Sequence, residues 1–338
     1  MLSVIIFHIQ EAWLPGGFVG VDIFFVISGY LISLQIMRHY SEGSFSFLEF
    51  YRRRIKRIMP VLLVIIGVGL VFSQIFFLPA DATKTANSAL WAILSLANVY
   101  FWFTEDKSYF APSSDEIPFL HLWSLGVEEQ FYLLWPVVLI LLLNKGNGRY
   151  FMPVALGITV LSYLFGQFAY KLSPSFMYYM LPARMGELLT GAILAHTVFK
   201  YDKPIPFLSS ISGIPLASVS LLVIIGSFFL ISEHQVFPGF RAIPPTLCTA
   251  LIIYSGHRNT NPIKKFLSLP FMVWIGKLSY SAYLWHWLLL AFYRYFYSNI
   301  TLSSGLLIFT ATFVLSYLSY RFVEVPFRYT KKNFERVL

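Results

Sequence analysis

Ionisable side chains are rare in this 338-residue sequence, and several of them interrupt long apolar stretches. His8 is the first, because it stands among Val, Ile and Phe residues near the start of the chain. Near neutral pH an imidazole can take a proton from a hydroxyl group and return it later. His8 is therefore a candidate general base, with a buried histidine that bonds to a backbone carbonyl as the structural alternative.

A second candidate cluster lies in the stretch HLWSLGVEEQFYLLWP, residues 121–136. His121, Ser124 and Glu128 follow the spacing i, i+3, i+7 and would share one face of a helix, whereas Glu129 falls about 100° away. One carboxylate could then face the protein interior beside the imidazole and the hydroxyl. The structural alternative is a polar seam between packed helices.

Further polar residues lie in apolar surroundings and are functional candidates for that reason. Asp22 stands near the start of one apolar stretch, and Arg184 and Glu187 are spaced to neutralise each other on one helix face. Tyr283 belongs to an aromatic stripe, with His286 beside it. Such a stripe is usually packing or an interfacial belt, so the spacing alone favours structural roles for these residues.

The densest charge lies in FYRRRIKRIMP, residues 50–60, where Arg52, Arg53, Arg54, Lys56 and Arg57 precede an apolar stretch. Guanidinium groups pair bidentately with phosphate, so the cluster predicts a phosphorylated cytosolic ligand. The alternative is an anchor that binds anionic lipid head groups. No P-loop, dinucleotide glycine motif or paired metal-ligand motif accompanies the cluster, and we expect no metal.

These candidates are held in a chain that is 57% hydrophobic and only 12% charged, with a mean hydropathy of +0.67. Soluble domains carry about 25% charged residues, so a soluble globule is excluded and an all-α polytopic membrane protein is predicted. The single cysteine, Cys248, excludes a disulfide framework. A transmembrane helix needs about 20 mostly apolar residues. Nine stretches are predicted spans: 18–37, 59–78, 122–143, 150–170, 176–199, 211–231, 243–255, 272–296 and 303–322.

Two other apolar segments are irregular. Residues 1–13 are too short to cross and indicate the second half of a helix whose beginning is missing. Residues 86–103 are long enough, but polar residues interrupt them. If residues 86–103 do not cross, the loops on the side of the arginine cluster hold 18 Lys and Arg residues and the opposite loops hold 4; if they cross, the numbers are 9 and 13.

Basic residues gather in cytoplasmic loops, so the first arrangement is favoured. We therefore predict about ten transmembrane helices, with a re-entrant or interfacial segment near residues 86–103 on the outer face. The same distribution excludes nucleic-acid binding as the explanation of the net charge of +9, because the basic residues lie in separate loops.

Five motifs follow one another along the chain: GGFVGVDIFFVISGYLI (16–32), FYRRRIKRIMP (50–60), HLWSLGVEEQFYLLWP (121–136), SYSAYLWHW (279–287) and FVEVPFR (322–328). In this order they closely resemble the membrane acyltransferase-3 family, and more narrowly its bacterial O-antigen and peptidoglycan O-acetyltransferase branch. The similarity covers nearly the whole chain.

The resemblance implies a multi-pass enzyme of the bacterial inner (cytoplasmic) membrane. Such an enzyme moves an acyl group, usually acetyl, from cytoplasmic acetyl-CoA to a hydroxyl of a polysaccharide or lipid-linked glycan, such as lipopolysaccharide O-antigen or peptidoglycan. Acetyl-CoA is a donor substrate, and no permanently bound cofactor is implied. The family's catalytic histidine falls on His8, its fourth-helix glutamate on Glu128, and its acyl-CoA-binding cluster on the four arginines named above. We expect Glu128 to orient the imidazole or stabilise its cation.

The sequence departs from the family pattern in two respects. Family members usually carry an arginine upstream of the first-helix histidine, at a position that here would precede Met1. Members of this branch often continue into a periplasmic SGNH-type domain, which here would follow Leu338, so such a domain or a partner protein is a further candidate. We expect one transmembrane domain over residues 1–328, with 329–338 as a cytoplasmic tail or the start of a linker.

Two other functions stay open from the residues alone. A transporter or flippase of a lipid-linked glycan would line its path with the same intramembrane charges. An inactive remnant that lacks its first residues is the other alternative.

Overall fold

The computed structural model of the chain describes residues 1–104, 115–200, 213–258, 260–297 and 299–329. Every regular element within these ranges is a helix, which confirms the all-α fold class. Residues 330–338 of the predicted tail lie outside the described residues, so the proposed boundary after residue 328 stays a prediction.

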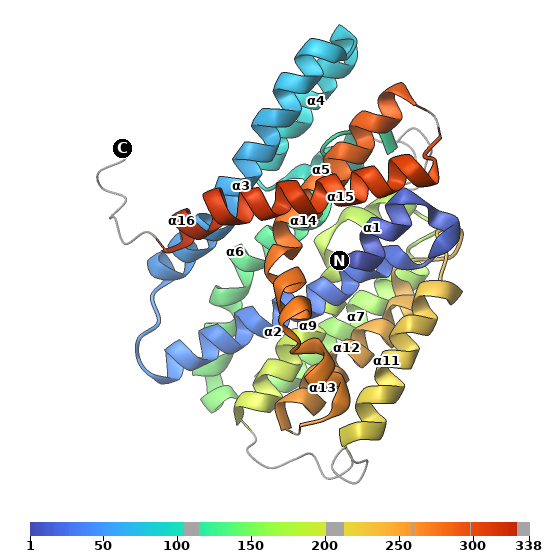
Figure 1. The fold of residues 1–338 in the computed structure, drawn as a ribbon. Coiled ribbons are helices and arrows are strands. Elements are labelled where there is room, and N and C mark those ends of the chain that lie inside the picture. The colour runs from blue at the N-terminus through green and yellow to red at the C-terminus, as the bar shows by residue number, and fades with distance from the viewer. Residues whose placement is uncertain (105–114, 201–212, 259, 298, 330–338) are drawn as a thin grey trace.

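The main helices run in the order shown in Figure 1 and are joined by short 3-10 segments. They are α1 (Leu2–Ile9), α2 (Gly20–Ser41), α3 (Phe47–Phe76), α4 (Pro79–Ile93), α5 (Ala97–Thr104), α6 (Leu122–Asn144), α7 (Phe151–Phe168), α8 (Pro174–Tyr179), α9 (Leu181–Lys200), α11 (Gly213–Leu230), α12 (Ile243–Arg258), α13 (Pro262–Leu267), α14 (Pro270–Phe296), α15 (Leu302–Ser319) and α16 (Val325–Tyr329). The short segments are η1 (Glu11–Trp13), η2 (Gly17–Val19), η4 (Lys145–Gly148) and η5 (Gly239–Ala242), and a π-helical turn, η6 (Tyr320–Glu324), joins α15 to α16.

Apolar helices long enough to cross a bilayer are present, as the composition predicts. Among the described residues, five segments meet the requirement by length and composition: Gly17–Ser41, Phe47–Phe76, Leu122–Asn144, Phe151–Phe168 and Leu302–Tyr329. Helices α7, α11, α12 and α14 begin and end within about three residues of the predicted stretches. The predicted total of about ten spans stays a prediction.

Two helix boundaries differ from those predicted. Helix α3 begins at Phe47, where the Ser46 side chain accepts a hydrogen bond from the backbone of Glu49, so the arginine cluster lies within the helix rather than before it. The prediction of one helix over residues 176–199 is wrong, because the backbone is extended at Met180. Pro182 stands in the first turn of α9, where it lacks the N–H that a continuous helix would need.

Residues 86–103 do not form one continuous helix. Helix α4 ends at Ile93 and α5 begins at Ala97, and between them Ser95 adopts a positive φ of 60°. The polar residue Asn98 is buried, donates to the carbonyl oxygen of Tyr179 at 3.2 Å and accepts from Gln130 at 2.8 Å. The side chain that lowered the hydropathy of this segment therefore bonds to neighbouring helices.

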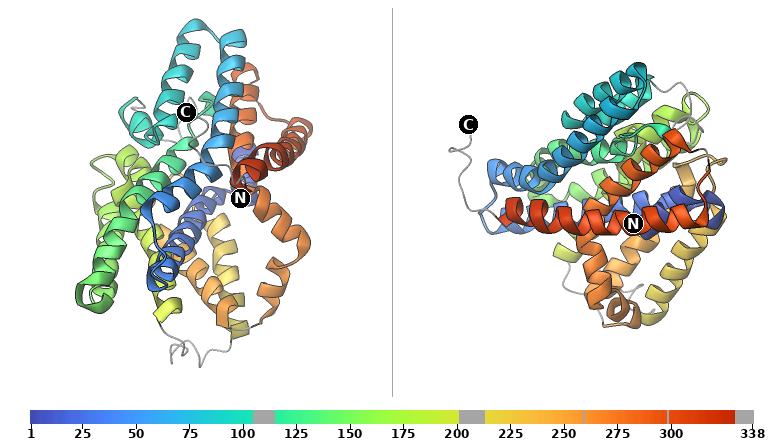
Figure 2. Two further views of the ribbon diagram at one scale, coloured as in Figure 1. Left: turned by 90° about the vertical axis from the view of Figure 1, so that its left-hand side faces the viewer. Right: turned by 45° about the horizontal axis from the view of Figure 1, so that its top comes forward.

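Helices α2 and α9 form the centre of the bundle, and glycines allow their backbones to meet. A Cβ atom on Gly29 would lie 1.8 Å from the carbonyl oxygen of Leu188, and one on Gly191 would lie 2.0 Å from that of Val26. Small residues at such a crossing are typical of membrane helix pairs. Helices α3 and α4 project beyond this bundle as an antiparallel pair (Figure 2).

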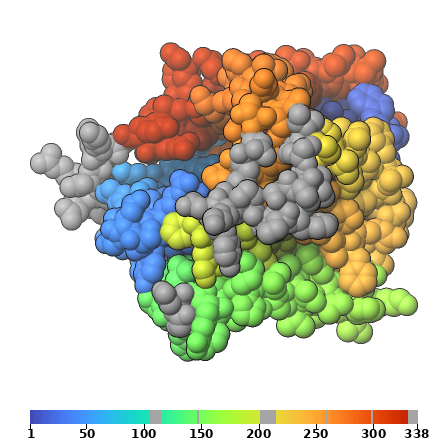
Figure 3. All heavy atoms as spheres, turned by 90° about the horizontal axis from the view of Figure 1, so that it is seen from below, coloured from blue at the N-terminus to red at the C-terminus, as the bar shows by residue number. Residues whose placement is uncertain are grey.

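Loops that the charge distribution assigns to the cytoplasm lie together. The face turned toward the viewer in Figure 3 carries the connection between α2 and α3, in blue, and the neighbouring ends of α6 and α7, in green. The α3 end of the first connection leads directly into the arginine cluster. The sidedness of these two loops relative to a membrane stays a prediction.

Candidate active site

The last turn of α1 meets the middle of α14, and each helix contributes one buried histidine. His8 is 5% exposed and His286 is fully buried. Nδ1 of His8 lies 3.1 Å from Nε2 of His286, and the two rings are stacked with their centroids 5.3 Å apart. The ring of Trp287 meets His8 edge-on at a centroid distance of 4.6 Å. Two histidines that are far apart in the sequence therefore form one pair.

The partners of this pair indicate which ring nitrogens carry hydrogen. Nδ1 of His286 lies 3.2 Å from the carbonyl oxygen of Ala282, which can only accept, so we assign a hydrogen to this nitrogen. A neutral His286 then presents Nε2 as an acceptor, and His8 donates to it from Nδ1. In this tautomer the lone pair of His8 is on Nε2, which is the form that a general base requires.

Arg294, in the last turn of α14, fixes the end of α1. Its Nη2 donates to the carbonyl oxygen of His8 at 2.6 Å, and its Nη1 forms an ion pair with Oδ2 of Asp115 at 3.1 Å. A cation stabilises the carbonyl groups at the end of a helix, which have no partner within the helix. Neither Arg294 nor Asp115 was predicted from the sequence. Arg294 could have been found from its spacing, because it follows Trp287 by seven residues and so lies on the same side of α14.

His121, Ser124 and Tyr283 form the next polar group. The Tyr283 hydroxyl donates to the carbonyl oxygen of His121 at 2.8 Å and lies 2.7 Å from Oγ of Ser124. The ring of His121, which is fully buried, has its centroid 6.0 Å from that of His286. These contacts extend the polar cluster from α14 to the beginning of α6.

Glu128 lies one step further along α6 and makes its hydrogen bond to α2. The Ser28 hydroxyl donates to Oε1 of Glu128 at 2.5 Å and accepts from the Tyr132 hydroxyl at 3.1 Å. Glu128 is also within electrostatic range of Tyr283. The hydrogen bonds of His8 Nδ1 and Glu128 go to His286 and Ser28, respectively, and the orienting role expected for Glu128 stays a prediction.

The arginine cluster divides into two parts. Arg52 and Arg53 form ion pairs with Glu49 at 2.9 and 3.7 Å, and both side chains are about 40% exposed. Arg54 and Arg57 are three residues apart on one face of α3 and are close enough to Glu128 to interact with its charge. Arg54 and Arg57 are therefore the cations that Glu128 links to the histidine cluster.

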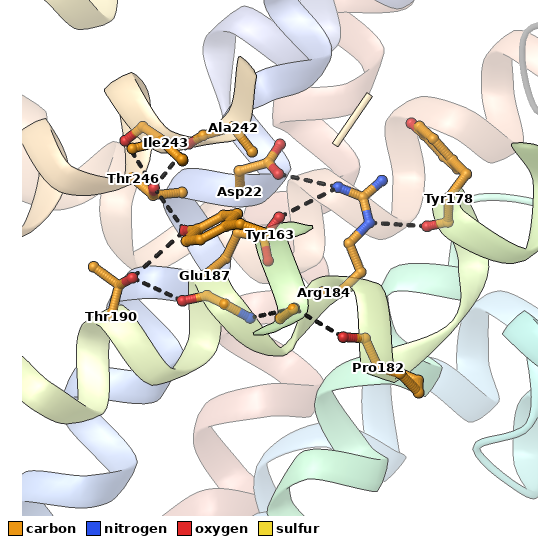
Figure 4. Close-up of polar contacts among 12 residues, drawn as sticks. Asp22, Tyr163, Tyr178, Pro182, Arg184, Glu187, Thr190, Ala242, Ile243 and Thr246 are labelled. Atoms are coloured by element: carbon orange, nitrogen blue, oxygen red, sulfur yellow. Dashed lines mark hydrogen bonds and ion pairs between the residues drawn. The ribbon is translucent and has the colours of Figure 1, made fainter. Parts of the chain in front are cut away.

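Asp22, Arg184 and Glu187 form a separate buried network between α2 and α9 (Figure 4). Nη1 of Arg184 lies 3.0 Å from Oδ1 of Asp22 and 3.8 Å from Oε1 of Glu187, which confirms the predicted pairing of Arg184 with Glu187. Nε donates to the carbonyl oxygen of Tyr178 at 2.9 Å, a group that the break before Pro182 leaves without a helical partner. Three rings lie 4.6 to 5.3 Å from the guanidinium carbon, those of Trp123, Tyr178 and Phe237.

A cavity of about 510 Å³ opens beside His8. Residues 7–12 line one side of it, and Asp115, Glu233, Trp287 and Arg294 complete the lining. A second cavity of about 560 Å³ lies between α11 and α12 and contains none of the predicted site residues. The cavity at His8 therefore gives a substrate a route to the candidate base.

The described residues were also compared with the geometry of metal sites. Among them, no group of three or more His, Cys, Asp or Glu side chains is arranged to hold a metal ion. The three neighbouring histidines, His8, His121 and His286, instead contact one another and aromatic rings.

Comparisons with known proteins identify the relatives of this chain. Residues 1–321 match the acyltransferase-3 family model, whose description is "Acyltransferase domain". The O-acetyltransferase OatA of Staphylococcus aureus strain NCTC 8325 / PS 47 is 34% identical over 353 residues, which cover 99% of this chain and 56% of OatA. The O-acetyltransferase candidate SACOL0978 of strain COL is 34% identical over 339 residues, which cover 97% of this chain and 55% of that protein.

The chain therefore spans about half the length of the curated relatives that it matches. No solved structure matches the chain.

Proposed function

We propose that this chain, which belongs to the acyltransferase-3 family, is the membrane part of an O-acetyltransferase that uses acetyl-CoA and acylates a hydroxyl of a cell-envelope glycan. The single observation that carries the proposal is the His8–His286 pair, which stands at a cavity and leaves Nε2 of His8 as a base. The relatives named above are O-acetyltransferases, and this supports acetyl as the group transferred.

The donor is proposed to bind at Arg54 and Arg57. Acyl-CoA carries phosphates, and arginine pairs with phosphate through two parallel hydrogen bonds. Arg54 bonds to Gln35 at 3.1 Å, which fixes its side chain inside the bundle, and Arg57 follows one turn later. By the predicted sidedness these cations face the cytoplasm, where acyl-CoA is present, and the cavity at His8 faces the opposite side.

The transfer step then uses His8 as follows. Nε2 of His8 removes the proton from the acceptor hydroxyl while the hydroxyl oxygen attacks the thioester carbonyl carbon. The C–S bond breaks, the acetyl group becomes an ester on the acceptor, and the thiolate of CoA takes the proton back from His8. His286 holds the imidazole in the required tautomer and, through its hydrogen bond, stabilises the cation formed in between.

The reaction path runs from Arg54 and Arg57 to His8. Three polar residues lie between these ends: Tyr283, Ser124 and Glu128. Tyr283 and Ser124 share a hydrogen bond of 2.7 Å next to His121, and Glu128 is in electrostatic range of both Tyr283 and the two arginines. We infer that these polar groups line the route by which the thioester end of the donor approaches His8.

The proposal is tested with purified protein in liposomes that are supplied with acetyl-CoA and a glycan. Release of free thiol, together with a gain of one acetyl group on the sugar, is expected for the unchanged chain and not for His8→Gln. His39→Gln is the matched control, because His39 bonds to the carbonyl oxygen of Gln35 in the last turn of α2, away from the cavity at His8. Glycan movement across the bilayer without thiol release would instead support a flippase.

A further inference from the structure

The described lining of the cavity beside His8 comes from four segments that are far apart in the sequence. The end of α1 and the η1 turn supply residues 7–12, the segment before α6 supplies Asp115, the segment before η5 supplies Glu233, and α14 supplies Trp287 and Arg294. Its volume of about 510 Å³ lies within the range of about 300–1,000 Å³ that small-molecule sites occupy. By its size and its position at the candidate base, it fits the acceptor rather than a structural void.

The charged groups of this cavity are mostly acidic. Among the described lining residues, three carboxylates, those of Glu11, Asp115 and Glu233, face one guanidinium, that of Arg294. Arg294 is already paired with Asp115 at 3.1 Å, so the charges of Glu11 and Glu233 exceed the cations of the lining. The ring of His8 adds no positive charge in the neutral form assigned above.

Arg294 is poorly placed to attract an anionic ligand. One of its terminal nitrogens donates to the carbonyl oxygen of His8 at 2.6 Å, and the other faces Asp115. Both terminal nitrogens of Arg294 therefore lie against groups of the protein itself, Nη2 as a hydrogen-bond donor and Nη1 in an ion pair. A ligand carboxylate or phosphate in the cavity would meet like charges that Arg294 does not offset.

A hydroxyl-rich neutral ligand meets suitable partners in the same cavity. Carboxylate oxygens accept hydrogen bonds from hydroxyl and amine groups, and Glu11 and Glu233 supply such oxygens. Trp287 supplies an apolar surface next to His8, and its indole nitrogen donates to the carbonyl oxygen of Ile117 at 2.8 Å, which fixes the ring. Carbohydrate combines these features, because a sugar ring has an apolar face and a rim of hydroxyl groups.

We propose that this cavity is the acceptor site and that it selects the hydroxyl of a neutral or amine-bearing sugar over that of an anionic sugar. This inference rests on the proposed function for the identity of the reaction, and it adds the chemical class of the acceptor. Glu11 and Glu233 are the residues that set this preference, and Trp287 positions the sugar ring beside Nε2 of His8.

The test measures binding and transfer separately, at pH 8 and with three probes. These are the methyl glycosides of N-acetylglucosamine, which is neutral, of glucosamine, which carries an amine, and of glucuronic acid, which is anionic. Saturation-transfer NMR reports binding of each glycoside to the protein in nanodiscs without acetyl-CoA. Thiol release and the mass of the product report transfer when acetyl-CoA is added.

The neutral and amine-bearing glycosides are expected to bind about fivefold or more tightly than the glucuronide, which corresponds to about 1 kcal/mol of charge repulsion. The double variant Glu11→Gln/Glu233→Gln should remove most of this difference. The control is Glu116→Gln, which removes one carboxylate charge next to Asp115 but outside the described cavity lining, and it should retain the preference.

Equal binding of the three glycosides, or a preference that the double variant leaves unchanged, would overturn the inference. Binding that follows the expected order without any thiol release would preserve the acceptor site and count against the proposed transfer reaction. The reverse result, His8-dependent thiol release with no charge preference, would preserve the reaction and refute the selectivity. The two proposals therefore fail in distinguishable ways.

Discussion

Nδ1 of His8 lies 3.1 Å from Nε2 of His286, a residue 278 positions later in the chain. This contact joins α1, a helix of eight residues, to the long helix α14. In the proposed mechanism, His286 keeps the hydrogen of His8 on Nδ1 so that Nε2 can act on a substrate.

Replacement of His286 tests this task. His286→Leu should lower kcat by about 10²–10⁴, the usual contribution of a general base held in the correct form. His286→Gln should retain more activity, because its amide oxygen can still accept from Nδ1 of His8. Steady-state kinetics should show the loss in kcat rather than in KM for acetyl-CoA, and equal losses in both variants would refute the positioning role.

The two parts of the arginine cluster should differ in their effect on the donor. Arg54→Gln and Arg57→Gln should raise KM for acetyl-CoA about tenfold or more, because each removes about 1.5–3 kcal/mol of charge-assisted hydrogen bonding. Arg52→Gln and Arg53→Gln should change KM much less, because Glu49 already pairs with both side chains. A larger effect at Arg52 or Arg53 would place the phosphates near Glu49 instead.

The network at Arg184 should contribute to stability. Arg184→Met leaves the carboxylates of Asp22 and Glu187 buried without their cation and should lower the free energy of unfolding by about 3–5 kcal/mol. The triple variant that adds Asp22→Asn and Glu187→Gln should recover much of this loss, because it buries no unpaired charge. Unfolding in detergent, followed by tryptophan fluorescence, measures both. A triple variant no more stable than Arg184→Met would contradict the electrostatic explanation.

Stability should also depend on pH through Glu233, which lies outside the membrane helices. Burial, and next the charge of Glu11, raise the pKa of the Glu233 carboxyl to about 7 from its ordinary 4.5. The folded chain then holds a proton that the unfolded chain has lost, so the free energy of unfolding falls as the pH rises from about 4.5 to about 7. Glu233→Gln should remove this part of the fall.

Melting temperatures at pH 5 and pH 8 check the effect of Glu233. Glu233→Gln should match the unchanged chain at pH 5 and exceed it at pH 8, whereas Glu116→Gln, at an exposed site, should follow the unchanged chain at both values. A gain from Glu233→Gln that is equal at pH 5 and pH 8 would show that titration is not its cause.

Much of the fold could be predicted because apolar length and polar interruption are local properties of the sequence. The bounds of α7, α11 and α14 follow from runs of apolar residues, and the interruption near Ser95 follows from polar residues within such a run. The earlier start of α3 was missed because arginine is a good helix former, so charge marks the edge of an apolar stretch but not the end of a helix.

The candidate site was predictable in its members but not in its pairings. His8, His286 and Glu128 each stand out as polar residues in apolar surroundings, yet spacing relates residues only within one helix. The pairing of His8 with His286, and of Asp22 with Arg184, depends on how helices from distant parts of the chain cross. Asp115 and Glu233 were missed because acidic residues in loops have no periodic neighbours that mark them.

The transfer of labelled acetyl across a membrane tests the central claim most directly. Inside-out vesicles expose the predicted cytoplasmic face, so acetyl-CoA labelled in its acetyl group is added outside while the glycan acceptor is enclosed. The label should appear on the enclosed glycan with the unchanged chain and with His39→Gln, and it should be lost with His8→Gln. Equal labelling of the glycan with His8→Gln would contradict the role assigned to His8, and no labelling with the unchanged chain would contradict the transfer itself.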